Sequence, residues 1–356
     1  MERIRVAVVM GGPSSEHDVS LRGGANVVDA LDRRRYEVRP VMITREGRWR
    51  VASKAVEGGR GAKGRPAGFD PLSPDVSWKE HAGPWSAIED LVDWKTDVAL
   101  PILHGRFGED GTIQACLQAA GIRFAGSGVR GSAIAIDKIR TKEVLSFHGV
   151  ATARFRALSR DDLARGRQAL AEEVCRELGT PLVVKDPLGG SSLEVRICDD
   201  PGDVALAFET IGAHGDRLLV EGFVKGRELT GGVLDDRERG RPVALPLVEL
   251  KPRNSRFFDY REKYDAEGAI EICPAEVTPE VEGAGRSLAL KVHELLGLRG
   301  VSRTDMILDG DGRLVVLEVN TMPGMTARSL VPQAAAAAGI DFAGVIERLI
   351  RTAGTD

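Results

Sequence analysis

The sequence has little aromatic content, few cysteines and no strong excess of charge of either sign. Aromatic residues make up 5% of the 356 residues, and the formal net charge is −4. A chain without a basic or acidic surplus gives no reason to expect a nucleic-acid or membrane partner, and no apolar run approaches the roughly 20 residues of a membrane span. The four cysteines show no C-x-x-C spacing, which favours reduced thiols in a cytoplasmic protein over a disulfide framework.

Glycine is abundant, with 42 residues, in an otherwise ordinary composition of 42% hydrophobic and 29% charged residues. This length and composition indicate a globular protein of two or three domains. In the N-terminal third, apolar runs alternate with helical patterns, which predicts a parallel α/β sheet. Its expected strands are residues 4–10, 37–43, 98–103 and 123–124, and its expected helices are residues 19–35 and 112–120. The charged first residues predict a strand rather than a signal peptide.

Residues 45–95 depart from this alternation. They are rich in glycine and proline, and they hold all four tryptophans, Trp49, Trp78, Trp85 and Trp94. We expect loops and small elements that pack on the first domain, and the sequence indicates no function for them.

The rest of the chain again predicts strands and helices. A helix is expected at residues 132–147 around Lys138, and the strand that begins at residue 181 is expected to end at Lys185. The other expected elements are strands at 193–197, 217–224 and 227–234, helices at 200–211 and 277–296, a loop at 256–268 and a helical tail from residue 331.

The most specific local pattern is a predicted hairpin near the C-terminus. Two strand-like runs, residues 302–306 and 314–320, flank an Asp-Gly-Asp-Gly turn. Residues two apart share a face of a strand, so Arg303 and Asp305 lie together in the first run, as do Glu318 and Asn320 in the second. The opposite face of the second run reads Val315, Leu317 and Val319, which suits a core. The side-chain oxygens of Asp305, Glu318 and Asn320 are ligands of the kind that hold Mg²⁺. The alternative is a polar face exposed to solvent. The Met-Pro-Gly-Met turn that follows the second run favours the metal site over that alternative.

Three further polar side chains lie at the ends of predicted strands. Glu16 could hold a substrate ammonium there, although a helix cap is the simpler interpretation of this residue alone. His104 could orient Glu16, handle a proton, or be structural. Lys185 precedes a Gly-Gly-Ser-Ser turn whose amides could bind an anion, and Lys138 is a second candidate for a phosphate. An ordinary hairpin with a surface lysine is the alternative for Lys185.

At these residues the chain resembles the D-alanine–D-alanine ligase family of the ATP-grasp superfamily, over nearly its whole length and in the family's order. The blocks that carry the resemblance are Gly11-Gly12-x-Ser14-x-Glu16, His104-Gly105-x-x-Gly108-Glu109-Asp110-Gly111, Gly126-Ser127-Gly128 through Asp137-Lys138, Cys273-Pro274-Ala275, Arg303-x-Asp305, and Glu318-Val319-Asn320-Thr321-x-Pro323-Gly324 through Ser329-Leu330. Each block is moderately specific, and their occurrence in order is very specific.

The resemblance implies a nucleotide and metal site with ATP and two Mg²⁺ ions, for which Mn²⁺ is an alternative. The implied nucleotide-binding residues are Lys138, Lys185, Ser192, Glu221, Phe223, Val224, Glu228 and Lys263. Within this set the lysines contact phosphates, Glu221, Phe223 and Val224 line the adenine pocket, and Glu228 takes the ribose hydroxyls. The implied metal ligands are Asp305, Glu318 and Asn320.

The resemblance also implies the residues that handle the two D-alanines. Glu16 would bind the ammonium of the first, and together with Ser191 and Tyr264 it would form a link that shuts a lid. Arg303 and the Gly324 N–H would stabilise an oxyanion. Ser329 and Leu330 would help to place the carboxylate of the second D-alanine, and His104 and Tyr264 are both candidates for taking its amine proton.

The implied fold is a three-domain ATP-grasp α/β fold. Its parts are an N-terminal parallel α/β domain at residues 1–130 and two α+β domains that sandwich ATP, a central lid domain at 131–220 and a metal- and adenine-binding domain at 221–356. The implied activity is ATP-dependent ligation of two D-alanines through an acyl phosphate for peptidoglycan precursor synthesis, by a cytoplasmic homodimer. A ligase for another pair, such as D-Ala–D-Ser or D-Ala–D-lactate, and an inactive nucleotide-binding homologue are the alternatives; Tyr264 favours D-alanine over D-lactate.

Overall fold

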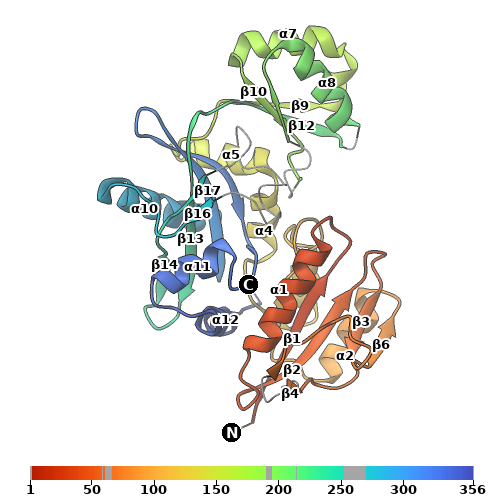
Figure 1. Ribbon diagram of the computed structural model, residues 1–356. Coiled ribbons are helices and arrows are strands. Elements are labelled where there is room, and N and C mark those ends of the chain that lie inside the picture. The colour runs from red at the N-terminus through yellow and green to blue at the C-terminus, as the bar shows by residue number, and fades with distance from the viewer. Residues whose placement is uncertain are drawn as a thin grey trace.

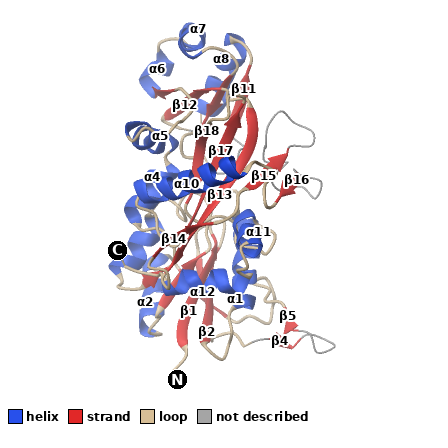
Figure 2. Ribbon diagram, turned by 90° about the vertical axis from the view of Figure 1, so that its left-hand side faces the viewer, coloured by secondary structure: helices blue, strands red, loops and turns tan. Residues whose placement is uncertain are grey.

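The computed structural model describes residues 2–57, 59–60, 66–189, 195–213, 215–251 and 270–355. The described chain forms three larger sheets and one two-stranded ribbon. Figures 1 and 2 show the first sheet at one end of the molecule, the second sheet at the other end and the third between them.

The first sheet has the order β6-β3-β2-β1-β7-β8. Its parallel strands are β1 (Ile4–Gly11), β2 (Tyr36–Ile43), β7 (Val98–Pro101) and β8 (Arg123–Phe124). Its helices are α1 (His17–Ala30), α2 (Pro84–Asp93) and α3 (Thr112–Ala119). The predicted parallel α/β sheet is therefore confirmed. The first helix begins two residues earlier than expected and ends five earlier, because Leu31 adopts an extended backbone (ψ 122°).

The tryptophan-rich segment contributes more regular structure than its composition predicts. It adds the antiparallel edge strands β3 (Trp49–Ala52) and β6 (Trp78–His81) to the first sheet, together with helix α2 and the ribbon of β4 (Gly59–Arg60) and β5 (Pro66–Ala67). Trp49 is buried edge-on against Phe107, with ring centroids 6.1 Å apart. The expectation that this segment packs on the first sheet is right, but strand pairing had not been expected.

The second sheet is antiparallel, with the order β11-β10-β12-β9. Its strands are β9 (Phe155–Ser159), β10 (Leu182–Lys185), β11 (Val195–Cys198) and β12 (Arg217–Gly222), and its helices are α6 (Arg160–Ala164), α7 (Arg167–Leu178) and α8 (Pro201–Gly212). Leu182, Val184, Leu218 and Val220 point into a core with α7 and α8. Since neighbouring strand residues alternate in direction, Lys185 and Glu221 lie on the opposite face.

The third sheet has the order β16-β15-β13-β17-β18, with β14 paired to β13. Its strands are β13 (Gly226–Asp236), β14 (Arg241–Ala244), β15 (Val248–Lys251), β16 (Ile270–Ile272), β17 (Val301–Asp309) and β18 (Leu314–Asn320). The helices that follow or precede them are α10 (Pro279–Leu295), α11 (Leu330–Ala337) and α12 (Phe342–Arg351).

The helix expected at residues 132–147 is two helices, α4 (Val129–Ile136) and α5 (Lys138–Phe147). Asp137 breaks it, because its carboxylate accepts hydrogen bonds from the backbone N–H groups of Ile139 and Arg140 and so caps α5. Both helices share a core with α10 and β18. The domain boundaries given above stay predictions.

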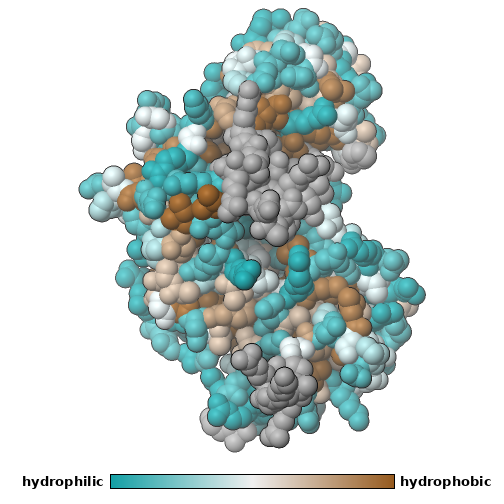
Figure 3. Space-filling model, viewed as in Figure 1, coloured by the Kyte–Doolittle hydropathy of each residue, from teal (hydrophilic) through white to brown (hydrophobic). Residues whose placement is uncertain are grey.

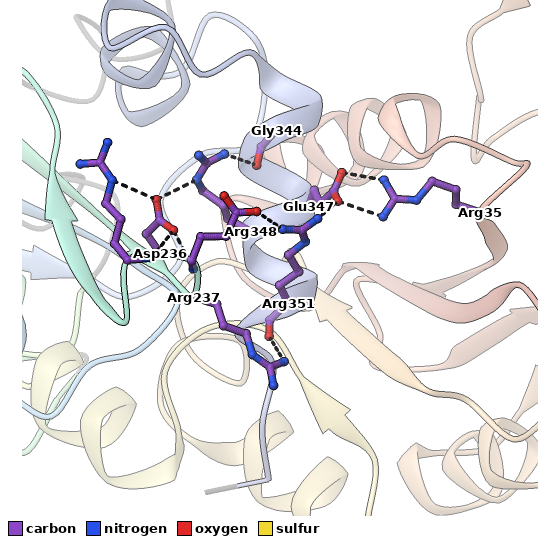
Figure 4. A network of polar contacts seen from close by, with 9 residues as sticks. Arg35, Asp236, Arg237, Gly344, Glu347, Arg348 and Arg351 are labelled. Atoms are coloured by element: carbon purple, nitrogen blue, oxygen red, sulfur yellow. Dashed lines mark hydrogen bonds and ion pairs between the residues drawn. The ribbon is translucent and has the colours of Figure 1, made fainter.

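The first and third sheets share one hydrophobic core, which runs from β1 and α1 to α11 and α12. The chain end returns to the first sheet, where Gly354 pairs with Phe124. Figure 4 shows Glu347 of α12 between Arg35 and Arg351: Arg35 donates to both of its carboxylate oxygens at 2.9 Å, and Arg351 lies 2.8 Å away. These contacts fix the first sheet against the third.

Hydrophilic and hydrophobic residues are interspersed over the face in Figure 3. Among the described helices, none alone has the length and apolarity to cross a membrane; α11 and α12 pass that test only as a pair, bent by 103°. All four cysteines are free, as the sequence indicates, and burial raises the pKa of the Cys198 thiol to about 12.

Asp90 on α2 ties the tryptophan-rich segment to the first sheet, and its loss should destabilise the protein. Its carboxylate lies 2.9 Å from Arg39 and 3.1 Å from both Lys79 and His81. Burial alone would raise the pKa of Asp90, but Lys79 and Arg39 hold it below its usual value. We expect Asp90→Ala to lower the free energy of unfolding by about 3 kcal/mol, as for one lost partner of a buried ion pair, measured by urea denaturation at pH 7.

The same carboxylate should make stability depend on pH. A lowered folded pKa stabilises the protein above the unfolded pKa, and this contribution disappears as the pH falls through the folded pKa. The difference between wild type and Asp90→Ala should therefore shrink in acid. Asp93→Ala, at an exposed position of the same helix, is the control; an equal loss in both variants would contradict this role of Asp90.

Candidate functional site

The hairpin of β17 and β18 brings its polar residues together across the strands. Asp305 lies opposite Glu318, and Arg303 lies opposite Asn320. The register shifts after Asp305, so that Met306 pairs with Val316 and Leu317 has no partner. Because of this bulge, the predicted apolar face of Val315, Leu317 and Val319 is wrong at Leu317. Val316 is buried, whereas Leu317 is only half-buried.

The carboxylates of this hairpin lie against cations. Arg303 donates to Asp305 with Nε and Nη2 at 2.9 and 2.7 Å, and the Thr230 hydroxyl also contacts Asp305. Glu318 lies 3.3 Å from the Lys138 ammonium. The Asn320 amide nitrogen is buried without a hydrogen-bond partner among the described residues, so it is a donor without an acceptor there.

The hairpin residues fit the donor chemistry of a Mg²⁺ site, with two carboxylates and one amide. Within the described ranges no group of three or more His, Cys, Asp or Glu side chains is arranged to hold a metal. The side-chain oxygen of Asn320 would add a third ligand to the two carboxylates, and water or a bound phosphate would supply the others.

Lys138 and Lys185 approach the site from α5 and β10. Lys138 begins α5; its ammonium donates to Gly189 O at 2.6 Å and its backbone N–H to Pro187 O at 3.0 Å. Lys185 and Lys142 both contact the carboxylate of Glu221. Sequence reasoning missed Lys142: its place one helical turn after Lys138 was readable, but its burial was not.

Glu221 is a buried carboxylate at the edge of the expected adenine pocket. Burial would raise its pKa, but Lys142 and Lys185 hold it below the usual value. The following residues Phe223 and Val224 are half-buried, and the Phe223 N–H donates to Pro181 O at 3.0 Å. Glu228 lies on β13, and its charge contributes to the raised pKa of Lys185, so these residues share one region.

The loop at residues 104–111 contacts the turn that follows the hairpin. Glu109 accepts from the Gly105 N–H at 2.8 Å and from the Met322 N–H at 3.2 Å. Burial raises the pKa of Glu109, while the charge of His104 and the two N–H groups oppose the rise and the charge of Glu16 adds to it. Glu109 is a site residue that the sequence analysis placed in a motif but did not single out.

Glu16 and His104 lie near Glu109 in this corner of the molecule. Glu16 occupies the N-cap position of α1, where the helix dipole favours its charge, but its side chain makes no capping hydrogen bond. His104 is buried, and its Nε2 has no hydrogen-bond partner within the described part of the chain.

A small pocket joins the loop at residues 104–111 to the hairpin. It is lined by Gly105, Glu109, Ala135, Ile136, Lys138, Gly189, Glu318, Val319, Asn320 and Thr321.

The turn after β18 ends at the N-terminus of α11. Ser329 precedes α11 and makes no side-chain cap; its hydroxyl instead lies 2.9 Å from the Thr326 hydroxyl. A Cβ at Gly324 would meet the Ser329 hydroxyl at 2.9 Å, so a side chain at this position would require that hydroxyl to move. Leu330 is buried at the start of α11. Ser191, Ser192, Lys263 and Tyr264 lie outside the described residues.

Comparison with known proteins identifies relatives over the whole chain. Residues 5–127 match the family described as D-ala D-ala ligase N-terminus, and residues 144–351 match D-ala D-ala ligase C-terminus. A D-alanine–D-alanine ligase of Nitratidesulfovibrio vulgaris is 41% identical over 98% of this chain and 97% of its own. One of Syntrophobacter fumaroxidans is 38% identical over 99% and 98%.

Two solved structures share the fold over nearly the full chain. The D-alanine–D-alanine ligase of Bacillus anthracis in complex with ATP is 28% identical, with a TM-score of 0.75 and coverage of 98% of this chain and 97% of that one. A D-Ala:D-Ser ligase of Enterococcus faecalis is 26% identical, with a TM-score of 0.78 and coverage of 98% and 99%.

Glu109 should hold the loop at residues 104–111 against the turn at Met322. Glu109→Ala leaves two buried N–H groups without an acceptor, and hydrogen bonds to charged groups contribute about 1.5–3 kcal/mol each. We expect hydrogen exchange at Gly105 and Met322 to accelerate by about 10- to 100-fold, measured by NMR or mass spectrometry. Glu294→Ala, at an exposed position, should leave both amides unchanged. Unaltered protection in Glu109→Ala would show that these hydrogen bonds do not hold the loop.

Proposed function

Because the chain belongs to the D-alanine–D-alanine ligase family of ATP-grasp enzymes, we propose that it joins two D-alanines into D-alanyl-D-alanine with ATP, for peptidoglycan precursor synthesis. The observation that carries the proposal is the meeting of an acid-bearing hairpin with a phosphate-facing lysine. Glu318 of β18 and Lys138 of α5 are 3.3 Å apart, although 180 positions separate them in the sequence. That contact supports a site in which a metal ligand and a phosphate-binding group would act together.

The first proposed step converts a carboxylate into an acyl phosphate. A carboxylate oxygen of the first D-alanine attacks the γ-phosphorus of ATP, and ADP leaves. Both reactants are anions, so the site must offset their repulsion. Lys138, Lys185 and Lys263 would do so at the phosphates, while Glu16 would hold the substrate ammonium. Asp305, Glu318 and Asn320 would hold two Mg²⁺ ions, or Mn²⁺, which supply charge neutralisation when bound.

The second proposed step forms the peptide bond. The amine of the second D-alanine attacks the acyl carbon, and the negative oxygen of the tetrahedral intermediate faces Arg303 and the Gly324 N–H before phosphate leaves. His104 or Tyr264 would take the amine proton. Ser329 and Leu330, at the N-terminus of α11, would place the second carboxylate, since a helix N-terminus favours an anion.

The remaining nucleotide contacts follow the family's pattern. Glu221, Phe223 and Val224 would line the adenine pocket, Glu228 would bind the ribose, and Ser192 would contact the phosphates. Ser191, Tyr264 and Glu16 would form the link that closes the site against water, which an acyl phosphate requires. We further propose a cytoplasmic homodimer with domains at residues 1–130, 131–220 and 221–356, and no nucleic-acid or membrane partner.

The decisive experiment supplies the protein with ATP, Mg²⁺ and D-alanine and measures both phosphate and dipeptide. We expect equal amounts of phosphate and D-alanyl-D-alanine, and no dipeptide without ATP. D-serine and D-lactate in competition with D-alanine test the second subsite. Turnover only with another acceptor would assign a related ligase, and nucleotide binding without any turnover would leave an inactive homologue.

The hairpin carboxylates should be responsible for the metal dependence. In wild type we expect the affinity for ATP to rise with Mg²⁺ concentration, because the cations hold the phosphates. Asp305→Asn and Glu318→Gln should each remove most of this rise in calorimetric titrations. Asp311→Asn, in the exposed turn of the same hairpin, is the matched control. If Asp305→Asn keeps the full Mg²⁺ dependence, the metal lies elsewhere.

A further inference from the structure

Lys142 is a buried charge to which the proposed mechanism gives no task. It lies on α5 one turn after Lys138, and its side chain is 1% exposed. The ammonium contacts the carboxylate of Glu221 and lies 5.9 Å from the centroid of the Phe155 ring. Lysine is almost never buried to this extent unless it is paired, so the pair with Glu221 determines its position.

Glu221 has two cations against one carboxylate. Glu221 lies on β12 and pairs with Val183 of the neighbouring strand β10. Lys185 is two residues after Val183 on that strand, so the side chains of Glu221 and Lys185 both point to the face away from the core of the second sheet. Lys185 contacts one carboxylate oxygen and Lys142 the other. Two ammonium groups on one carboxylate repel each other, although the charge of Glu318 acts on both lysines and that of Glu228 on Lys185.

Lys185 and Lys142 differ in how readily each could move away from the Glu221 carboxylate. The Lys185 side chain is 11% exposed, whereas that of Lys142 is 1% exposed. Burial and the charge of Lys185 lower the pKa of Lys142, whereas the charges of Glu221 and Glu318 raise it. If Lys185 moved away, one ammonium would remain on the Glu221 carboxylate. An incoming polyanion can draw Lys185 away, but Glu221 would then be buried without a counter-ion if Lys142 were absent.

We propose that Lys142 is a positioning residue for the nucleotide: it stays as the counter-ion of Glu221 when Lys185 turns to the phosphates, and it keeps the carboxylate in place to accept a hydrogen bond from the 6-amino group of adenine. This inference rests on the proposed function, in which Lys185 meets phosphate and Glu221 meets adenine. Lys142 itself touches neither. Phosphate binding and base recognition are coupled through the shared carboxylate.

The test is Lys142→Met, which keeps the length of the side chain and removes its charge. Lys185 then becomes the sole counter-ion of Glu221 and is retained there, because an unpaired buried charge is strongly unfavourable. We expect the affinity for a non-hydrolysable ATP analogue with Mg²⁺ to fall about 10- to 100-fold. The preference for that analogue over its inosine counterpart, which lacks the 6-amino group, should fall toward unity. The KM for D-alanine should not change.

A double variant separates charge balance from packing. In Lys142→Met/Glu221→Gln the neutral amide needs no counter-ion, and Lys185 is free for the phosphates. We expect this variant to bind the ATP analogue more tightly than Lys142→Met alone, a coupling that a merely structural role would not produce. Arg140→Met, at an exposed position of the same helix, should match wild type. The double variant also tests the proposal if Lys142→Met alone does not fold.

The outcomes distinguish this inference from the proposed function. Wild-type affinity and base preference in Lys142→Met, or a double variant no tighter than the single one, would overturn the role of Lys142 even if dipeptide forms normally. The expected binding pattern without any dipeptide would sustain the role of Lys142 and remove the ligase assignment. A wild-type protein that binds no nucleotide would remove both.

Discussion

A carboxylate withdrawn from water keeps its charge only when a cation lies against it, and this constraint governs the site. Asp305 is paired with Arg303, Glu318 with Lys138, and Glu221 with Lys142 and Lys185. The cations come from a strand of the third sheet, from α5 and from the second sheet. The pairs of Glu318 and Glu221 therefore hold elements together as well as balancing charge, whereas the Arg303–Asp305 pair lies within β17. A nucleotide with its metals would exchange these partners rather than enter a neutral cavity.

The same constraint gives the short helix α5 a central part in the arrangement of the site. Asp137 caps the helix and also accepts from Arg217 at 2.7 Å, which fixes the first turn against β12. Lys138 and Lys142 then leave the helix on one side, toward Glu318 and Glu221 respectively. A single short helix thus sets the distance between the expected metal ligands and the expected adenine pocket, with Gly189 held at its N-terminus.

Sequence reasoning succeeded where the pattern is local. The apolar run that predicts β1, the turn that predicts the β17–β18 hairpin and the lysine that ends β10 are all contained in short stretches of chain. It failed where the outcome depends on distant partners: the bulge at Leu317 arises from pairing with β17, and the burial of Lys142 arises from β12. The break at Asp137 could have been found, because aspartate before a helical run is a common cap. Strands β3 and β6 could not, since their pairing joins residues about 30 apart.

The shared core of the first and third sheets has a consequence for biosynthesis. Val345, Ile346 and Leu349 of α12 pack with β1, and Gly354 adds to β8. The first sheet is synthesised before α12, yet it lacks part of its interior until that helix has been made. The second sheet closes its own core within residues 158–220. We therefore expect the middle of the chain to be the earliest part to acquire native protection, ahead of the N-terminus, reversing the usual order of co-translational folding.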